Sequence, residues 1–363
     1  MEANNDFELY KRFEFTEKYE KYIKEVLNPH IPNFEIASAR SLSYDSFQLS
    51  MSPFGKVLEG SQFYYNEGNT FVHFTNLEAV KSILSEGCIN LSGLNTSTDK
   101  NEILLNLKPF QTKTNIFLDE EVIKADFLNL SLSPFDLENI ESLQTCYENL
   151  KNNFYGFGKD FPIALVMEID LTNRNEWYKF HLSKIQYSQI NEKPPHFLEN
   201  LIKNTELWIE ENNYQITGLQ DAIYPLLSFF KESKYSIENE IRLIKSPIDS
   251  TDDNKYSANH AFFNGVYVNS RNEVVQIERL YFESDKREKI IRTLKLDEPI
   301  KTFFQTQFPR INLKKILLPT HKTKAETFEV KKILYQLAQY HNMNIEFLFM
   351  EFHENHKEVH LFE

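Results

Sequence analysis

Residues 71–91 read FVHFTNLEAVKSILSEGCINL and carry the clearest fold signal in the chain. An apolar strand pattern at 71–74 leads into residues 75–78, whose Thr-Asn-Leu-Glu order resembles a capping box that opens a helix. The helical pattern stops at Gly87, a residue type that commonly ends helices in the left-handed conformation. Alternation resumes at 88–91. The segment therefore predicts a strand, a helix and a second strand in succession.

The chain downstream of this block continues to mix strands and helices. Residues 127–133 alternate leucines with polar residues, which predicts a strand whose polar face carries Ser131 and Ser133. A helix is expected at 136–151. The run PIALVMEID at 162–170 is almost entirely apolar, which is typical of a central strand. These patterns predict an α+β protein.

Further elements are expected on both sides of this region. They are a helix within 7–28, helices at 196–211 and 217–231, strands at 235–244, 262–268, 274–283 and 314–318, a helix at 324–341 and a strand at 343–350. No internal repeat or low-complexity linker is visible. The pattern is that of an irregular α+β chain.

Composition points to a folded, cytoplasmic protein. Of the 363 residues, 41% are hydrophobic, and 31 Phe and 18 Tyr provide ample material for a core. No run approaches the roughly 18 apolar residues of a membrane span, and the N-terminus lacks the order of a signal peptide. Cys88 and Cys146 are too few and too far apart for a disulfide framework or a zinc ribbon. We expect both to be reduced thiols and the protein to be cytoplasmic.

Charge and glycine content exclude several function classes. Lys and Arg total 40 against 53 Asp and Glu, and the resulting formal charge of −13 disfavours non-specific nucleic-acid binding. The nine glycines form no phosphate-binding loop, since the nearest candidate, 156–159, lacks a third glycine and a following Ser or Thr. A P-loop nucleotidase and a Rossmann dehydrogenase are therefore not expected.

Glu238 and Glu240 form the most chemically suggestive pair. On the strand expected at 235–244 they share one face with Arg242. Two adjacent carboxylates can stabilise a cationic, oxocarbenium-like transition state or orient a sugar hydroxyl. The alternative is a solvated outer face on which Arg242 pairs with the carboxylates.

A second candidate site lies around His73. This residue ends a strand directly before a helix N-terminus, where backbone N–H groups favour a ribose or phosphate. Ser131 and Ser133 could supply hydroxyl donors, and Tyr155 could stack on a base. The alternative for each is an ordinary polar or core position. His353, His356 and His360 lie in a charged terminal segment that is a poor platform for a metal, so no metal site is predicted.

Five motifs, taken in order, resemble those of the bacterial family known as domain of unknown function 2971. The opening His-Tyr-Thr motif of that family, which is similar to that of diphtheria-toxin-like and DNA-modifying ADP-ribosyltransferases, is matched at 71–77 and 83–87. The remaining matches are 130–133 with a Cys-Phe-Ser strand, 155–159 with a Tyr-Gly turn, 235–244 with a Glu-Trp-Arg strand, and 316–319, 324–341 and 344–346 with a C-terminal strand-helix-strand.

The resemblance implies an α+β, ADP-ribosyltransferase-like fold with a split antiparallel sheet flanked by helices over residues 70–350. Residues 1–69 would form an N-terminal helix and irregular extension, and 351–363 a charged C-terminal tail. The implied activity is that of an NAD-dependent mono-ADP-ribosyltransferase or NAD-consuming effector, with a toxin or phage-defence role. Implied partners are NAD, a protein or nucleic-acid acceptor and a neutralising partner, with no membrane.

The same resemblance implies roles for individual residues. Glu240 corresponds to the catalytic glutamate and Glu238 to the first acid of a Glu-x-Glu pair. Phe74 stands where the family has Tyr, and Ile241 where it has Trp. The residues implied to contact NAD are His73, Phe74, Thr75, Ser131, Ser133 and Tyr155. Because Phe74 lacks the hydroxyl, a non-catalytic nucleotide-binding module on the same fold is the first alternative, and a protein-interaction module is the second.

Overall fold

The structure is a computed structural model that describes most of the chain. The described residues are 14, 16–43, 46–52, 55–93, 127–151, 161–188, 196–212, 226, 228–246, 264–268, 274–282, 292, 305–320, 324–353 and 358–363.

The chain divides into two compact units that interleave along the sequence. The first consists of residues 1–65, 92–129 and 174–248, and the second of residues 66–91, 130–173 and 249–363. This division differs from the consecutive ranges expected from the sequence, because distant strands pair within one sheet. Residues 351–363, expected as a charged tail, instead contain the end of one strand and the whole of another.

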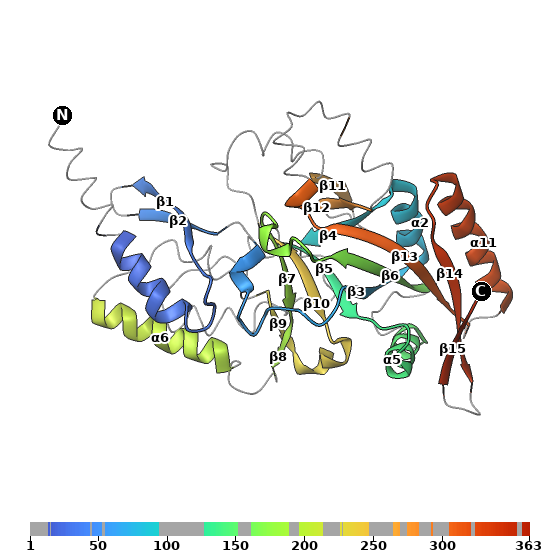
Figure 1. Cartoon of the computed structure of the whole chain (residues 1–363), viewed down its shortest axis with the longest axis horizontal. Helices are drawn as coiled ribbons and strands as arrows, with labels where there is room; N and C mark the ends of the chain where they lie inside the picture. Colours follow the sequence, from blue (N-terminus) through green and yellow to red (C-terminus); the bar gives the residue numbers. More distant parts are fainter. Residues whose placement is uncertain are drawn as a thin grey trace. The chain divides into compact units, whose positions relative to one another are not determined.

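A large, mostly antiparallel sheet forms the centre of the second unit (Figure 1). β3 (Thr70–Asn76) pairs antiparallel with β6 (Pro162–Asp170), which pairs antiparallel with β13 (Arg310–Pro319). β13 runs parallel to β14 (Glu346–His353), and β14 forms a hairpin with β15 (Glu358–Phe362). The coarse prediction of an α+β fold built on an antiparallel sheet flanked by helices is confirmed.

Four further strands extend this arrangement. β5 (Leu128–Pro134) pairs antiparallel with β3, where Val72 faces Ser133. β12 (Val274–Tyr281) lies between β4 (Cys88–Gly93) and β11 (Asn264–Val268). The strands expected near 262–268 and 274–283 are therefore present.

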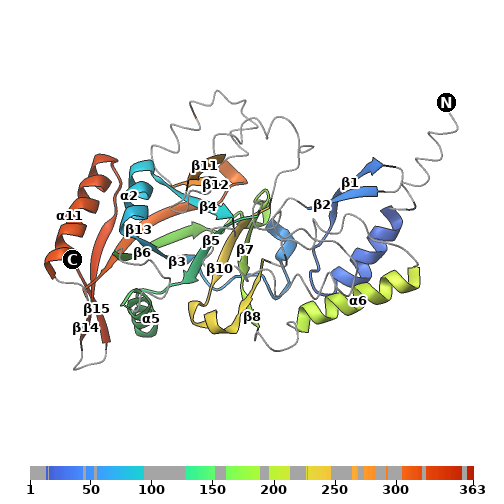
Figure 2. The same ribbon diagram turned by 180° about the vertical axis from the view of Figure 1, so that it is seen from behind.

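Helices cover both faces of the sheet. α2 (Leu77–Glu86) and α11 (Lys324–Tyr340) pack against each other on one side, and α5 (Ile140–Lys151) lies on the other (Figures 1 and 2). The Asn76 side chain caps α2 by accepting a hydrogen bond from the N–H of Ala79 at 2.9 Å. Gly87 ends α2 with φ of 66°, as the sequence pattern predicts.

Apolar side chains fill the space between the sheet and α5. This core contains Val72, Phe74, Phe135, Leu143, Cys146, Tyr147, Leu150, Ala164, Val166, Leu317, Leu348, Met350 and Val359. Cys146 is thus a buried core thiol, and Cys88 in β4 is also buried. Both are free, which confirms the prediction of unbridged cysteines.

The N-terminal part of the first unit packs helix against helix. A π-helical segment, η1 (Ile23–Leu27), continues the expected N-terminal helix and lies against α6 (His196–Asn212). The rings of Tyr22 and Trp208 meet edge to face at 5.3 Å between centroids. β1 (Ile36–Ser43) and β2 (Ser46–Met51) form a separate hairpin.

Two short 3-10 helices approach closely in the same unit. They are η2 (Gly55–Leu58) and η4 (Arg174–Glu176). A Cβ atom at Gly55 would lie 2.1 Å from the carbonyl oxygen of Arg174, so only glycine fits there. The buried guanidinium of Arg174 donates to the carbonyls of Tyr65 and Leu182.

The remaining elements of the first unit hold the candidate site. β7 (Phe180–Lys184) pairs antiparallel with β10 (Ile241–Lys245), and β8 (Gln186–Ser188) pairs parallel with β9 (Phe230–Glu232). The 3-10 helix η5 (Ser233–Glu238) connects β9 to the segment before β10. The prediction of a helix over 217–231 is wrong for its C-terminal end, because Phe230 and Lys231 belong to β9.

Candidate functional site

The chain changes direction between the two glutamates singled out in the sequence. Glu238 ends η5, Asn239 adopts the left-handed conformation with φ of 43°, and Glu240 directly precedes β10. Asparagine tolerates this conformation better than most residues, and its N–H donates to the carbonyl of Ser236 at 3.1 Å. The prediction of one continuous strand over 235–244 is therefore wrong.

Both carboxylates are nevertheless brought together, and both are buried. The exposed fraction is 7% for Glu238 and 3% for Glu240. Lys231 on β9 reaches between them, and its Nζ donates to Oε2 of Glu238 at 2.6 Å and to Oε2 of Glu240 at 3.1 Å. The alternative of a solvated outer face is contradicted by this burial.

Arg242 holds the Glu240 carboxylate from the other side. Its Nε donates to Oε1 of Glu240 at 2.8 Å and its Nη2 donates to Oε2 at 3.2 Å. Its Nη1 donates to the carbonyl of Ser228 at 2.7 Å. A guanidinium fork that is itself fixed in this way fixes the plane of the carboxylate. We call Lys231, Glu238, Glu240 and Arg242 the charge cluster.

The main chain of Glu240 is also anchored. Its N–H donates to the hydroxyl oxygen of Tyr187 at 2.8 Å, and its carbonyl accepts from the N–H of Ile185 at 3.1 Å. Burial raises the pKa of Tyr187 above its ordinary value, so this residue acts as a neutral hydroxyl. Contacts to the side chain and to the backbone therefore both hold Glu240 in place.

The formal charges of the cluster balance, with two carboxylates and two cations. Burial raises the pKa of Glu238 to about 7, the negative charge of Glu240 adds to this rise, and Lys231 opposes it. Burial alone would lower the pKa of Lys231, but the two carboxylates together raise it above the ordinary value. Near neutral pH, Glu238 therefore exchanges a proton while Lys231 keeps its charge.

Sequence reasoning missed Lys231 and Tyr187. Lys231 lies seven positions before Glu238, inside a stretch where a helix is expected, and Tyr187 is on a strand far away in sequence. The parallel pairing of β8 with β9 brings the two strands together. No local pattern signals such a pairing.

His73 on β3 makes a hydrogen bond that fixes its tautomer. Its Nδ1 lies 2.9 Å from the carbonyl oxygen of Ser131, and a carbonyl only accepts, so Nδ1 carries the proton. Burial lowers the pKa of His73, although the bond to Ser131 acts in the opposite direction. The ring is therefore neutral at pH 7, and Nε2 presents a lone pair that can accept a hydroxyl proton.

Three of the residues expected around His73, namely Phe74, Ser131 and Ser133, lie on the opposite face of the sheet. Because Ser133 pairs with Val72, strand alternation places the side chains of Ser131 and Ser133 opposite to that of His73. Phe74 is buried in the core under α5, whereas Thr75, two residues after His73 on β3, shares its face and is buried. What His73 contacts is thus the backbone of Ser131.

Two parts of the expected NAD site stay predictions. Tyr155 lies outside the described residues. His73 belongs to the second unit and Glu240 to the first. The expected convergence of these two side chains on one cleft therefore stays a prediction.

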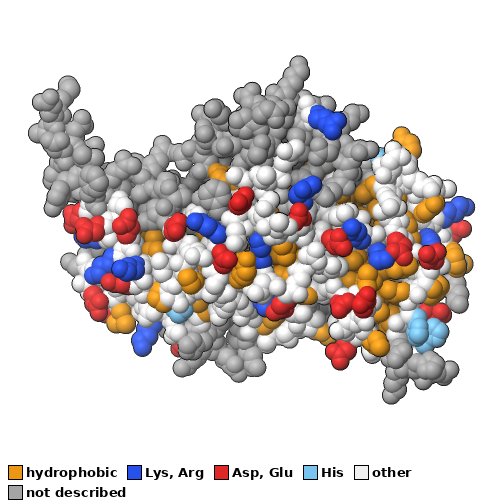
Figure 3. Space-filling view, viewed as in Figure 1, with side chains coloured by type: hydrophobic (Ala, Val, Ile, Leu, Met, Phe, Trp, Pro, Cys, Tyr) orange, Lys and Arg blue, Asp and Glu red, His pale blue; other side chains and the backbone are white. Residues whose placement is uncertain are grey.

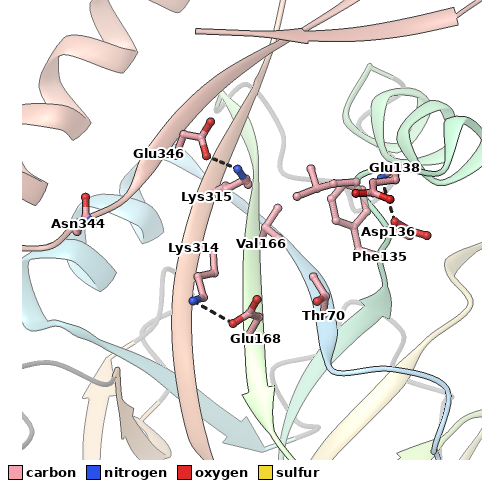
Figure 4. Close-up of a pocket in the computed structure, with 11 residues that line it drawn as sticks. Thr70, Phe135, Asp136, Glu138, Val166, Glu168, Lys314, Lys315, Asn344 and Glu346 are labelled. Carbon is pink, nitrogen blue, oxygen red and sulfur yellow. Dashed lines mark hydrogen bonds and ion pairs between the residues drawn. The ribbon is translucent and has the colours of Figure 1, made fainter.

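The second unit contains a pocket of about 530 Å³ beside the start of α5 (Figure 4). This volume falls within the ~300–1,000 Å³ of small-molecule sites. Lys314 pairs with Glu168 at 3.0 Å, and Lys315 pairs with Glu346. The full lining is Thr70, Phe135, Asp136, Leu137, Glu138, Val166, Glu168, Lys314, Lys315, Asn344 and Glu346. We call it the sheet pocket.

A β-bulge explains how two consecutive lysines line the same pocket. Leu313 pairs with Met167 and Lys315 with Val166, so Lys314 is an extra residue in β13. Without the bulge, Lys314 and Lys315 would point to opposite faces of the sheet. Every lysine in the lining is paired with a carboxylate, so an anionic ligand would have to displace ion pairs.

The described part of the chain shows neither a metal-binding cluster nor a helix that could cross a membrane. Within it, no group of three or more His, Cys, Asp or Glu side chains is arranged to hold a metal ion. Among the described helices, none is both long enough and apolar enough to cross a membrane.

Comparisons with family models, with curated proteins and with solved structures found no match. The resemblance to the bacterial domain of unknown function 2971 therefore stays a prediction that rests on its five motifs. The structure itself defines a two-unit α+β protein with a buried, charge-balanced acidic pair.

Proposed function

We propose that this protein is an NAD-dependent mono-ADP-ribosyltransferase or NAD-consuming effector that uses Glu240 and Glu238 in different roles. The observation that supports the proposal is that the two carboxyl groups have different surroundings. Arg242 grips Glu240 through two nitrogens, whereas the pKa of Glu238 is raised to about 7 by burial. Paired acids with such different environments are typical of acid–base sites.

In the proposed reaction, the bond between C1′ of the ribose and the nicotinamide nitrogen breaks, and the bonding electrons leave with nicotinamide. Positive charge then develops at C1′, and the fixed Glu240 carboxylate stabilises it. The acceptor forms a bond to C1′ and loses a proton to Glu238, whose pKa of about 7 suits a base at neutral pH.

NAD would be seated by groups of the second unit. The neutral His73 ring, with its proton on Nδ1, supports acceptance of a ribose hydroxyl at Nε2. Thr75, which shares the face of His73 on β3, and Tyr155 belong to the same proposed binding region, whereas Ser131 contributes the carbonyl that fixes the His73 ring. The acceptor would be a protein or nucleic acid. A toxin or phage-defence role, with a neutralising partner, follows from the class of chemistry alone.

A second candidate function is a non-catalytic nucleotide-binding or protein-interaction module. Two observations favour it. The charges around Glu240 are already balanced inside the protein, and Phe74 is packed in the core rather than in a site. A buried, fully paired carboxylate is also what a purely structural network would contain.

The deciding experiment is release of nicotinamide from NAD by purified protein, with transfer of labelled ADP-ribose to cell extract followed by mass spectrometry. Glu240→Gln keeps the shape of the side chain and removes its charge, so the rate should fall about a hundredfold to a thousandfold. Glu329→Gln, on the exposed side of α11, is the matched control and should leave the rate unchanged.

Folding of the variant is checked by its melting curve before rates are compared. An unchanged rate in folded Glu240→Gln removes the catalytic assignment of this residue. If the wild-type protein releases no nicotinamide, the non-catalytic module becomes the better description. Glu238→Gln should impair transfer to the acceptor more than release of nicotinamide, because its proposed role begins after the bond to nicotinamide breaks.

A further inference from the structure

Lys231 and Arg242 make different contributions to the charge cluster. Arg242 bonds to Glu240 and to the backbone of Ser228. The Lys231 ammonium is bonded to both carboxylates, at 2.6 Å to Glu238 and 3.1 Å to Glu240. Lys231 is therefore the cation that bridges the acidic pair.

We propose that Lys231 is a positioning residue that holds Glu238 and Glu240 as one coupled acidic pair, so that Glu238 can take up a proton beside a fixed Glu240 carboxylate. The catalytic consequence rests on the proposed function. The bridge itself does not, because it is a property of the folded first unit.

The groups that face Glu238 come from three neighbouring segments. Lys231 lies on β9, and Glu240 precedes β10. Tyr187 lies on β8, where burial chiefly raises its pKa and both carboxylates add to that rise. The ring of Tyr235, on η5 itself, lies 4.8 Å from the Lys231 ammonium and limits its movement. Like charges this close repel strongly in a buried setting unless a cation lies between them.

Removal of the ammonium should therefore affect Glu238 more than Glu240. Arg242 still neutralises Glu240 in a Lys231→Met variant, but Glu238 loses the cation at 2.6 Å while the negative charge of Glu240 remains. Glu238 should then keep its proton to higher pH. Lys231→Arg restores the positive charge. The double variant, Lys231→Met with Glu238→Gln, removes both charges of the ion pair between Lys231 and Glu238.

The first readout is the pH dependence of nicotinamide release and ADP-ribose transfer. In Lys231→Met, the limb of the transfer profile that reports Glu238 should shift upward by about one pH unit or more. Lys231→Arg should bring it back toward the wild-type position. Lys18→Met, which removes an exposed ion pair with Glu14 in the same unit, is the matched control and should leave the profile unchanged.

The second readout does not require activity. Trp177 and Trp208, the two tryptophans of the chain, are buried in the first unit and report its melting by fluorescence. When folding raises the pKa of a carboxyl group, the folded state becomes less stable as pH rises from the pKa of that group in the unfolded chain to its pKa in the folded protein. The melting temperature of Lys231→Met should therefore fall further below that of wild type at pH 8 than at pH 6. In the double variant, the decrease should be the same at both pH values.

These readouts separate the two proposals. If wild-type protein has no activity, the proposed function fails, and the melting comparison still decides whether Lys231 bridges the pair. An equal loss at pH 6 and pH 8 in Lys231→Met, or a difference that persists in the double variant, overturns the positioning role. An active Lys231→Met with an unshifted transfer profile overturns it as well.

Discussion

The two units use the same kinds of ion pair in opposite surroundings. In the charge cluster, the exposed side-chain fractions are 11% for Lys231, 2% for Glu240 and 1% for Arg242. In the sheet pocket, Lys314 and Glu168 pair at a similar distance but are 41% and 42% exposed. Buried charges depend on their partners, because water cannot replace a partner that is lost, whereas exposed charges are rescued by solvent. Exposure, more than the number of ion pairs, therefore decides which of the two regions matters for stability.

The surface of the second unit adds a contrast in polarity. Hydrophobic side chains gather over α11, β14 and β15 in the space-filling view (Figure 3). Phe328, Tyr335 and Tyr340 on α11 are 55%, 46% and 82% exposed. The polar pocket and this apolar face thus lie in the same unit, while the charge cluster of the first unit is enclosed.

The largest expected effect is that of Arg242→Met. Loss of this guanidinium leaves Glu240 buried with one cation fewer and leaves the Ser228 carbonyl without its bond. We expect the first unit to lose about 3–5 kcal/mol of unfolding free energy. Urea unfolding followed by tryptophan fluorescence measures this, since Trp177 and Trp208 both lie in this unit.

A loss below about 1 kcal/mol for Arg242→Met would break the contrast between the regions. It would place the cluster in the same class as a solvated ion pair. Glu240→Gln combined with Arg242→Met is the companion variant. It removes both charges of one pair and should be less destabilised than Arg242→Met alone.

An intermediate effect is expected from Glu238→Gln, and it depends on pH. The pKa of Glu238 is raised on folding from 4.5 to about 7, chiefly by burial, so the unfolded chain releases this proton at lower pH than the folded protein does. Wild-type stability should therefore decline as pH rises from about 4.5 to about 7, by up to about 1.4 kcal/mol per pH unit from this group.

Glu238→Gln removes that contribution, so its stability curve should be flatter across the same window. Denaturant unfolding of both proteins at pH 5, 6 and 7 provides the comparison. Parallel curves for the two proteins would show that Glu238 has the same proton affinity in the folded and unfolded states.

The smallest effect is expected from Lys314→Met. Its pair with Glu168 is about two-fifths exposed on both sides, so loss of the ammonium should change stability by less than about 1 kcal/mol. Thermal melting at low and at 0.5 M salt is the measurement. A loss as large as that of Arg242→Met would show that the pocket charges are as dependent on each other as those of the cluster.

Local periodicity was sufficient to predict much of the second unit. The strand, helix and strand of 71–91 and the apolar strand at 162–170 are present, because their signals lie within a few consecutive residues. The cap at Asn76 and the end of α2 at Gly87 follow from residue preferences at helix termini, which can be recognised in the sequence alone. The pairing of these strands into one sheet required the structure.

The candidate site was only partly predictable for a related reason. Alternation in YSIENEIRLI imitates a strand, but Asn239 turns left-handed and residues 233–238 form a 3-10 helix. Glu238 and Glu240 still meet, because Lys231 bridges them from β9. A long-range contact of this kind leaves no period in the sequence, which is why the acids were identified and their cation was not.

The bulge at Lys314 has a consequence for how β13 is encoded. Before it, the buried side chains of one face are at the odd-numbered Ile311 and Leu313. After it, Ile316 and Leu318 continue that face on even numbers, while Leu317 is buried on the other face, in the core under α5. The two-residue repeat of the strand thus contains a one-residue phase shift. The strand expected at 314–318 covers only the half that contains the continuous apolar run 316–318, whereas β13 spans Arg310–Pro319. Deleting Lys314 would bring both halves into a single phase while keeping every core residue on its own side.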